Sequence, residues 1–362
     1  MQFHRSRPAA GLICAAGFLF QAVPAQASSS QNIYGIVDAC VARSDLGAAS
    51  RSMLNGGCLS GSRLGFRGTE DLGGSLRAYF TLEMGFNTDD GAIGQGGRAF
   101  GRKALVGLRG TAGAIEMGRD YGTTFYVVQP VDPMGLGIGT ASSTIWSGAP
   151  TTTSGRVNNS LVYLSPSYAG FSMRAQIAPG EQSSPHAKRG ADAKGFNLIY
   201  RQGAAFVGLS HTRVSNTTDN NDDRATTLVA KYDFGRFSLV GIAQDGAWKG
   251  SRTLAAPSNP SSFFSRNYRS YLLGGSVKAG IGSINASFKR YDDRTSANFD
   301  ADQWSINYLH PLSRRTTVYA GYSRLSNKRL SSYGVSDAST AYSGVTPGAS
   351  TSFLAVGMRH AF

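Results

Sequence analysis

Residues 75–86 read SLRAYFTLEMGF, a stretch in which apolar and polar side chains alternate one by one. Its even positions are all apolar, while its odd positions include arginine, tyrosine, threonine and glutamate. A helix would place Arg77 and Glu83 among the apolar residues, whereas a strand sends both to the opposite face. The pattern therefore predicts a β-strand, and its twelve residues are enough for the ~9–11 residues of a tilted membrane strand.

The same alternation recurs at 171–177 and 284–289, where Arg174 and Lys289 lie on the polar face. Charged residues in the middle of a strand are untypical of a soluble sandwich and fit a wet lumen. After Ser28 no apolar stretch approaches the ~20 residues of a membrane helix. Membrane strands whose lipid-facing and lumen-facing residues alternate explain both observations.

Short and long polar connections alternate along the chain. Seven short turns separate eight long connections, which run near 44–60, 87–100, 120–157, 179–193, 214–223, 246–265, 292–299 and 326–348. Fifteen connections imply sixteen strands, an even number as bacterial barrels require. We expect an all-β fold, a closed antiparallel transmembrane barrel of sixteen strands in one domain.

The N-terminal residues are typical of a secretory signal peptide. Arg5 and Arg7 precede an apolar run over 9–20, and small residues at Ala25 and Ala27 suit cleavage. We expect residues 1–27 to be removed and residues 28–362 to form the barrel domain, exported through the periplasm. Removal of Arg5 and Arg7 with this segment would lower the net charge from +14 to +12. A positive net charge fits either a solvated surface or a cationic pore.

Two cysteines, Cys40 and Cys58, follow the predicted cleavage point. An oxidising compartment permits a disulfide between them, and two separate thiols are the alternative. Two thiols with few histidines do not make a convincing zinc site, so we expect no metal and no cofactor. None of the histidines of the mature chain lies in a recognisable catalytic motif, which argues against an enzyme.

The last ten residues form another alternating stretch. Leu354, Val356, Met358 and the terminal Phe362 share one face. A terminal aromatic residue that closes an amphipathic strand resembles the signal read by the outer-membrane assembly machinery, so we assign that role to Phe362.

Several motifs together resemble the general porins of Gram-negative bacteria, especially those of β-proteobacteria. They are Ile33 to Asp38 (IYGIVD), Ser62 to Gly74 (SRLGFRGTEDLGG), Gly101 to Leu108 (GRKALVGL), Gly118 to Tyr121 (GRDY), Asp132 to Gly135 (DPMG), Arg156 to Ser160 (RVNNS) and Val356 to Phe362 (VGMRHAF). The resemblance implies a sixteen-stranded barrel, a homotrimer and a third external loop that folds into the lumen. Here that loop would run from about Asp120 to Gly155.

In such porins, arginines on the barrel wall face acidic groups on the inward loop. Matching the motifs places Arg63, Arg119 and Arg156 on the arginine ladder and Asp132 on the loop. Strand parity adds further lumen-facing charges, for which a solvated charge or a structural ion pair away from the narrowest point is the alternative. They are Arg77, Arg109, Arg174, Glu83 and Glu116.

Only Asp120 and Asp132 are acidic between 120 and 155, so we expect a net positive constriction and a preference for anions. The predicted function is passive diffusion of small hydrophilic solutes and ions through an outer-membrane channel, without nucleic acid as a partner. A substrate-specific channel of the same fold is an alternative. An adhesin or receptor that acts through the external loops is another.

Overall fold

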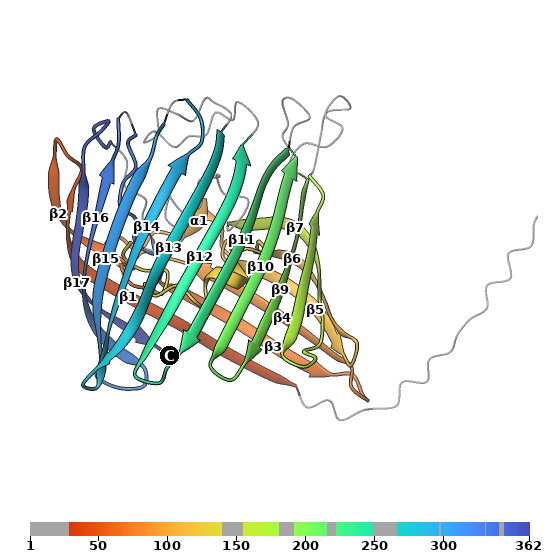
Figure 1. Cartoon of the computed structure of the whole chain (residues 1–362). Helices are drawn as coiled ribbons and strands as arrows, with labels where there is room; N and C mark the ends of the chain where they lie inside the picture. Colours follow the sequence, from red (N-terminus) through yellow and green to blue (C-terminus); the bar gives the residue numbers. More distant parts are fainter. Residues whose placement is uncertain are drawn as a thin grey trace, which may run out of the picture.

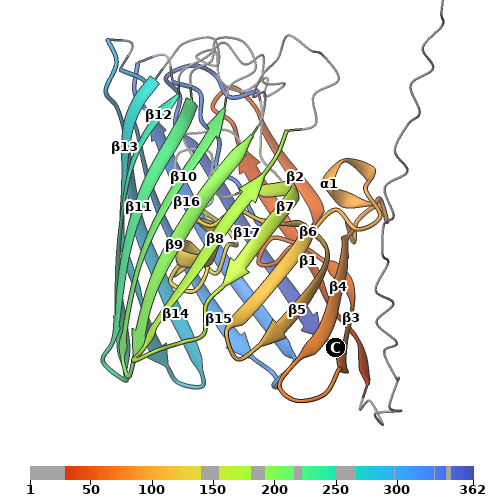
Figure 2. The ribbon, with the colours of Figure 1, turned by 90° about the vertical axis from the view of Figure 1, so that its right-hand side faces the viewer.

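The computed structural model describes residues 29–139, 155–180, 192–215, 222–248, 266–296, 298–329, 331–339 and 344–362. Figure 1 and Figure 2 show tilted strands that enclose a lumen. The predicted signal peptide, residues 1–27, lies outside the described residues, as does 140–154 of the predicted inward loop.

The described residues form seventeen strands and two helices of four residues each. The strands are β1 (Ser30–Asp45), β2 (Ser50–Gly56), β3 (Arg63–Asp71), β4 (Arg77–Gly85), β5 (Lys103–Gly110), β6 (Gly113–Tyr121), β7 (Arg156–Leu164), β8 (Phe171–Ala178), β9 (Ala193–Gln202), β10 (Ala205–Ser215), β11 (Asp222–Asp233), β12 (Phe237–Trp248), β13 (Arg266–Ala279), β14 (Gly282–Asp293), β15 (Ala301–Pro311), β16 (Thr316–Asn327) and β17 (Thr351–Ala361). The helices are α1 (Gly94–Gly97) and α2 (Phe125–Val128). No helix among the described residues is long and apolar enough to cross a membrane.

Each strand pairs antiparallel with its neighbours, and the sheet closes where β1 meets β17. On its other side β1 pairs with two strands placed end to end, β3 along 30–36 and β2 along 39–45. β2 and β3 together therefore fill one position. The seventeen strands of the described residues make a barrel of sixteen positions, and the predicted fold class is confirmed.

The predicted alternation separates an apolar outer wall from a polar inner wall. On β14, Phe288 is 50% exposed while the neighbouring Lys289 is 1% exposed. On β8, Phe171 and Met173 are exposed while Arg174 is buried. Outside, apolar side chains face lipid, and inside, polar side chains bond to one another or to the loops that enter the barrel.

The first external connection differs from the expected loop over 44–60. β1 and β2 extend the hairpin through Asp45 and Ser50, and only 57–62 leaves the wall. The Asp38 carboxylate accepts hydrogen bonds from the Ser60 amide (2.9 Å) and the Tyr319 hydroxyl (2.6 Å). A disulfide joins Cys40 to Cys58 in the structure, with Cα atoms 6.1 Å apart. These contacts hold the inserted segment against β1.

The C-terminus completes the closure. The backbone of Phe362 exchanges hydrogen bonds with Gly35, which donates at 3.2 Å and accepts at 3.1 Å. A Cβ atom on Gly35 would lie 2.3 Å from the Phe362 ring, so only glycine leaves room for that ring. The assembly role of Phe362 stays a prediction.

Candidate pore constriction

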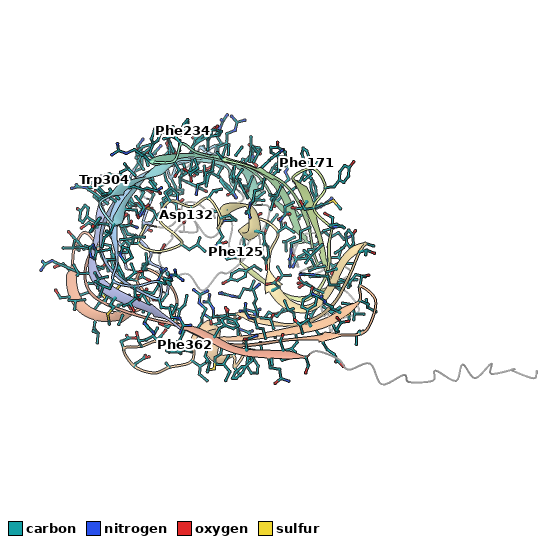
Figure 3. All side chains as sticks on the ribbon, turned by 90° about the horizontal axis from the view of Figure 1, so that it is seen from below. Phe125, Asp132, Phe171, Phe234, Trp304 and Phe362 are labelled. Atoms are coloured by element: carbon teal, nitrogen blue, oxygen red, sulfur yellow. A yellow bond between two sulfur atoms is a disulfide. The ribbon has the colours of Figure 1, made fainter. Side chains whose placement is uncertain are left out.

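The connection after β6 enters the barrel and lies against the inner faces of β9 to β13. Figure 3 shows Phe125 and Asp132 of this connection inside the ring of strands. The segment 122–139 is called the inward loop below. Its path agrees with the inward-folded third external loop that the resemblance implies.

Apolar contacts and hydroxyl groups hold the inward loop. Val127, Val128 and Val131 are buried in one cluster with residues of β10 to β13, namely Phe206, Val229, Val240, Ile242 and Leu272. The hydroxyl groups of Thr123 and Thr124 lie 3.1–3.3 Å from those of Ser210 and Thr212 on β10. Burial of valine side chains contributes about 1.5–3 kcal/mol each, so this cluster fixes the loop on the wall.

Asp132 stabilises the turn that follows. Its carboxylate accepts hydrogen bonds from the backbone amides of Met134 (3.0 Å) and Leu136 (3.1 Å). Farther along, the Lys289 ammonium donates to the Gly139 carbonyl at 2.7 Å. The structure therefore places Asp132 in the loop's own turn and not among the residues that line the narrow cavity described next.

A cavity of about 690 Å³ separates the inward loop from the opposite wall. The loop side is formed by Phe125, Tyr126, Gln129, Gly135 and Leu136. Among the described residues, five basic and two acidic side chains line the cavity: Arg63, Arg102, Lys103, Arg156 and Arg359 against Glu83 and Asp337. The excess of cations gives the cavity a positive potential.

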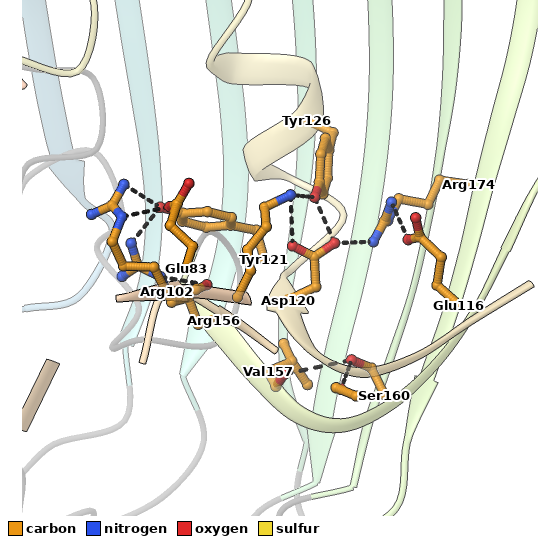
Figure 4. Close-up of polar contacts among 12 residues, drawn as sticks. Glu83, Arg102, Glu116, Asp120, Tyr121, Tyr126, Arg156, Val157, Ser160 and Arg174 are labelled. Carbon is orange, nitrogen blue, oxygen red and sulfur yellow. Dashed lines mark hydrogen bonds and ion pairs between the residues drawn. The ribbon is translucent and has the colours of Figure 1, made fainter. Parts of the chain in front are cut away.

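Three of the arginines gather around Glu83 and Tyr121. The Arg102 guanidinium forms a buried ion pair with Glu83 at 2.6 Å. Arg156 donates to the Tyr121 hydroxyl and to the Arg102 carbonyl, and its guanidinium lies 4.3 Å from the centre of the Tyr121 ring (Figure 4). Arg63 is oriented by a 3.1 Å bond from its Nε to the Gly61 carbonyl. One carboxylate thus neutralises one of three neighbouring guanidiniums.

A second charged network joins the inward loop to β5, β6 and β8. The Asp120 carboxylate contacts Lys103 Nζ (3.1 Å) and Arg174 Nη2 (2.5 Å) and accepts a hydrogen bond from the Tyr126 hydroxyl (2.6 Å; Figure 4). Arg174 also lies 3.4 Å from Glu116. Burial, followed by the nearby Asp120 carboxylate, raises the pKa of Tyr126, so its phenol stays protonated as a donor. These charges fix the start of the loop.

The structure brings together some of the predicted charges and separates others. Arg63, Arg156 and Glu83 line the cavity, whereas Arg174 and Glu116 are buried in the Asp120 network. Arg119 lies at a bulge of β6 and bonds to the Gly101 carbonyl at 2.8 Å and to Asn158, outside the cavity lining. Arg77 and Arg109 face each other in register at the short-turn ends of β4 and β5.

Sequence reasoning missed Arg102, Lys103, Arg359 and Asp337. Arg102 precedes β5, so strand parity does not apply to it. Arg359 could have been found, since it alternates with the outward-facing Met358. Asp337 lies in the last long connection, where it accepts a hydrogen bond from Asn55 at 2.7 Å. The alternation of strand residues does not predict the path of this connection.

A closed barrel narrowed by an inserted loop, with charged side chains at the narrowing, defines a channel of the porin class. The chain belongs to the Gram-negative porin family, whose model matches residues 9–330. It is therefore an outer-membrane channel protein of Gram-negative bacteria.

Individual relatives agree with this assignment. Outer membrane porin protein 32 of Delftia acidovorans is 32% identical over 348 residues, covering 93% of this chain and 95% of the relative. An outer membrane porin protein of Bordetella pertussis is 29% identical, covering 82% of this chain and 89% of the relative. The solved anion-selective porin from Comamonas acidovorans superposes with a TM-score of 0.80 at 32% identity, covering 92% of this chain and all of that one. OmpT of Vibrio cholerae, at 14% identity and a TM-score of 0.64, shares the fold.

Proposed function

We propose that this porin passes small hydrophilic solutes by passive diffusion and prefers anions. The observation that carries the proposal is the excess of five basic over two acidic side chains around one cavity. Arg63, Arg102 and Arg156 lie together there, and Glu83 forms an ion pair with Arg102. The solved Comamonas relative, called anion-selective, supports the same preference. Its physical basis is fixed positive charge in the cavity between the inward loop and the opposite wall, without catalysis.

The arrangement suits transient contact with anions. Guanidinium groups hold their charge at any physiological pH and present several donors to a carboxylate or phosphate. Arg102 and Arg156 are held by Glu83 and Tyr121, so little further ordering is needed when an anion arrives. In a wide, wet lumen salt screens the field over about 8–10 Å, so the preference should weaken as ionic strength rises.

We infer a trimer and a cleaved leader as well. The family resemblance supports both, and the leader pattern of residues 1–27 supports the second. An apolar outer wall, with exposed Val106, Leu108 and Ile115 among others, can face either lipid or a second copy. An unheated gel of the extracted protein should show a species about three times the mass of the heated one.

The function is tested in a planar bilayer under a potassium chloride gradient. The zero-current potential should have the sign of anion preference and should shrink as salt concentration increases. With salts of small carboxylates, conductance should rise linearly with their concentration. A potential of the opposite sign contradicts the anion preference, and saturable flux that one solute blocks would favour a substrate-specific channel.

A further inference from the structure

An aromatic stack lies where the inward loop leaves the wall. Tyr121 ends β6, and Phe125 begins α2. Their rings are parallel, with ring centres 3.6 Å apart and planes inclined by 9°. Tyr121 is buried, whereas the Phe125 side chain is partly exposed and lines the cavity, inside the ring of strands (Figure 3). Phe125 therefore presents part of an aromatic surface to passing solutes.

Phe125 differs from the apolar residues that hold the inward loop. Val127, Val128 and Val131 are buried in the cluster with β10 to β13, and Phe125 lies outside that cluster. The anchoring of the loop therefore does not account for a partly exposed ring at this position. Contact between an apolar ring and water is unfavourable, and a solute group that covers the Phe125 ring removes that contact.

The aromatic stack adjoins the guanidinium groups of the cavity. Arg102 and Arg156 both donate to the Tyr121 hydroxyl (Figure 4). The Arg156 guanidinium also lies 4.3 Å from the centre of the Tyr121 ring. A single ring, that of Tyr121, connects these cations to Phe125, and Arg63 lines the same cavity. An exposed aromatic surface and several fixed cations are therefore within reach of one small solute.

An aromatic ring joined to a carboxylate matches the chemistry of this surface. A carboxylate accepts charge-assisted hydrogen bonds from guanidinium groups. An aromatic ring stacks on another ring or meets it edge-on, and such a pair is more favourable than the burial of the same area alone. A flat aromatic ring should therefore be preferred to a saturated ring of similar size.

We propose that the constriction favours aromatic carboxylates, such as benzoate, over aliphatic carboxylates of the same charge and similar size, and that Phe125 determines this preference. The proposal rests on the anion preference proposed above and adds the class of anion. The ring of the solute contacts Phe125, and its carboxylate faces Arg63, Arg102 and Arg156. The contact is transient, because conduction requires a site that is favourable enough to enter and weak enough to leave.

The test is the zero-current potential of the mature protein in a planar bilayer, with potassium benzoate on one side and potassium cyclohexanecarboxylate at equal concentration on the other. Both carboxylates are ionised at neutral pH, so the potential reports the ratio of their permeabilities. We expect benzoate to be about threefold more permeant in the wild type, the effect of one aromatic pair. F125L, which lacks the ring, should bring the ratio close to one, and F125Y should restore it. F171L makes the same change on the outer wall and should match the wild type.

The wild type in a potassium chloride gradient separates this inference from the proposed function. Equal permeability of the two carboxylates in a wild type that prefers chloride over potassium would overturn the aromatic preference alone, and this outcome does not depend on how the variants fold. An unchanged ratio of the two carboxylates in a conducting F125L channel would also overturn the assignment to Phe125. A wild type that prefers potassium over chloride would contradict the proposed function and, with it, the aromatic preference.

Discussion

The two sides of the lumen are built differently. On the side of β3 to β7, charged side chains such as Arg102 and Glu83 form ion pairs with one another. The same side chains line the cavity. On the side of β9 to β13, valines and threonine hydroxyls hold the inward loop. The width of the channel therefore depends mainly on apolar burial, while its ion preference depends on the opposite, charged wall.

The largest effect should come from V127D/V128D, which breaks the apolar side. Both valines are fully buried, and an unpaired carboxylate there costs several kcal/mol. The loop should leave the wall, and single-channel conductance should rise clearly above that of the wild type. Q129N, which keeps the charge and the polar character of an exposed neighbouring position, is the control. Unchanged conductance in the double variant would show that the loop is not held by this cluster.

Next in size is D120N, which acts where the two sides meet. Removing this carboxylate leaves the buried Arg174 and the half-buried Lys103 without their shared anion, and breaking a buried pair costs about 3–5 kcal/mol. We expect a lower thermal unfolding temperature and noisier open-channel current. D71N disrupts only the exposed pair with Arg77 and should cost less than about 1 kcal/mol. Equal unfolding temperatures for the two variants would contradict the assigned role of Asp120.

E83Q should leave the loop in place and alter the charged wall alone. It removes the carboxylate that pairs with Arg102. At ~8 Å in water one charge changes the energy of a passing ion by about 0.5 kcal/mol, with opposite sign for anions and cations. The ratio of anion to cation permeability should therefore rise about fivefold at low ionic strength. An unchanged ratio would mean that Glu83 does not influence the permeating ions.

The smallest effect concerns pH. The pKa of Tyr126 is raised by burial and by Asp120, so the neutral phenol keeps its bond to Asp120 below the ordinary tyrosine value of about 10. Its contribution to stability is complete below pH 10 and is lost as pH rises through the raised pKa. Conductance should therefore be constant from pH 7 to pH 10. A change in this range that is absent in Y126F would contradict this assignment.

The fold was predictable because one physical rule covers most of the chain. Lipid on one side and water on the other impose the period of two that β4, β8 and β14 show. The constriction was only partly predictable, since some of its residues lie outside regular strands, where the period of two does not apply. Arg102 precedes β5, Arg119 lies at a bulge of β6, and Asp132 accepts hydrogen bonds from amides of its own loop. These positions depend on tertiary contacts that no local pattern contains.

The most direct test of the two-sided account is the zero-current potential of R63Q/R156Q under a potassium chloride gradient, compared with R77Q/R109Q. Each variant loses two lumen charges, the first pair in the cavity and the second at the short-turn ends of β4 and β5. We expect the cavity variant to lose about thirtyfold in the ratio of anion to cation permeability at low ionic strength, at unchanged conductance, while the other variant stays near the wild type. Equal losses in the two variants would contradict it.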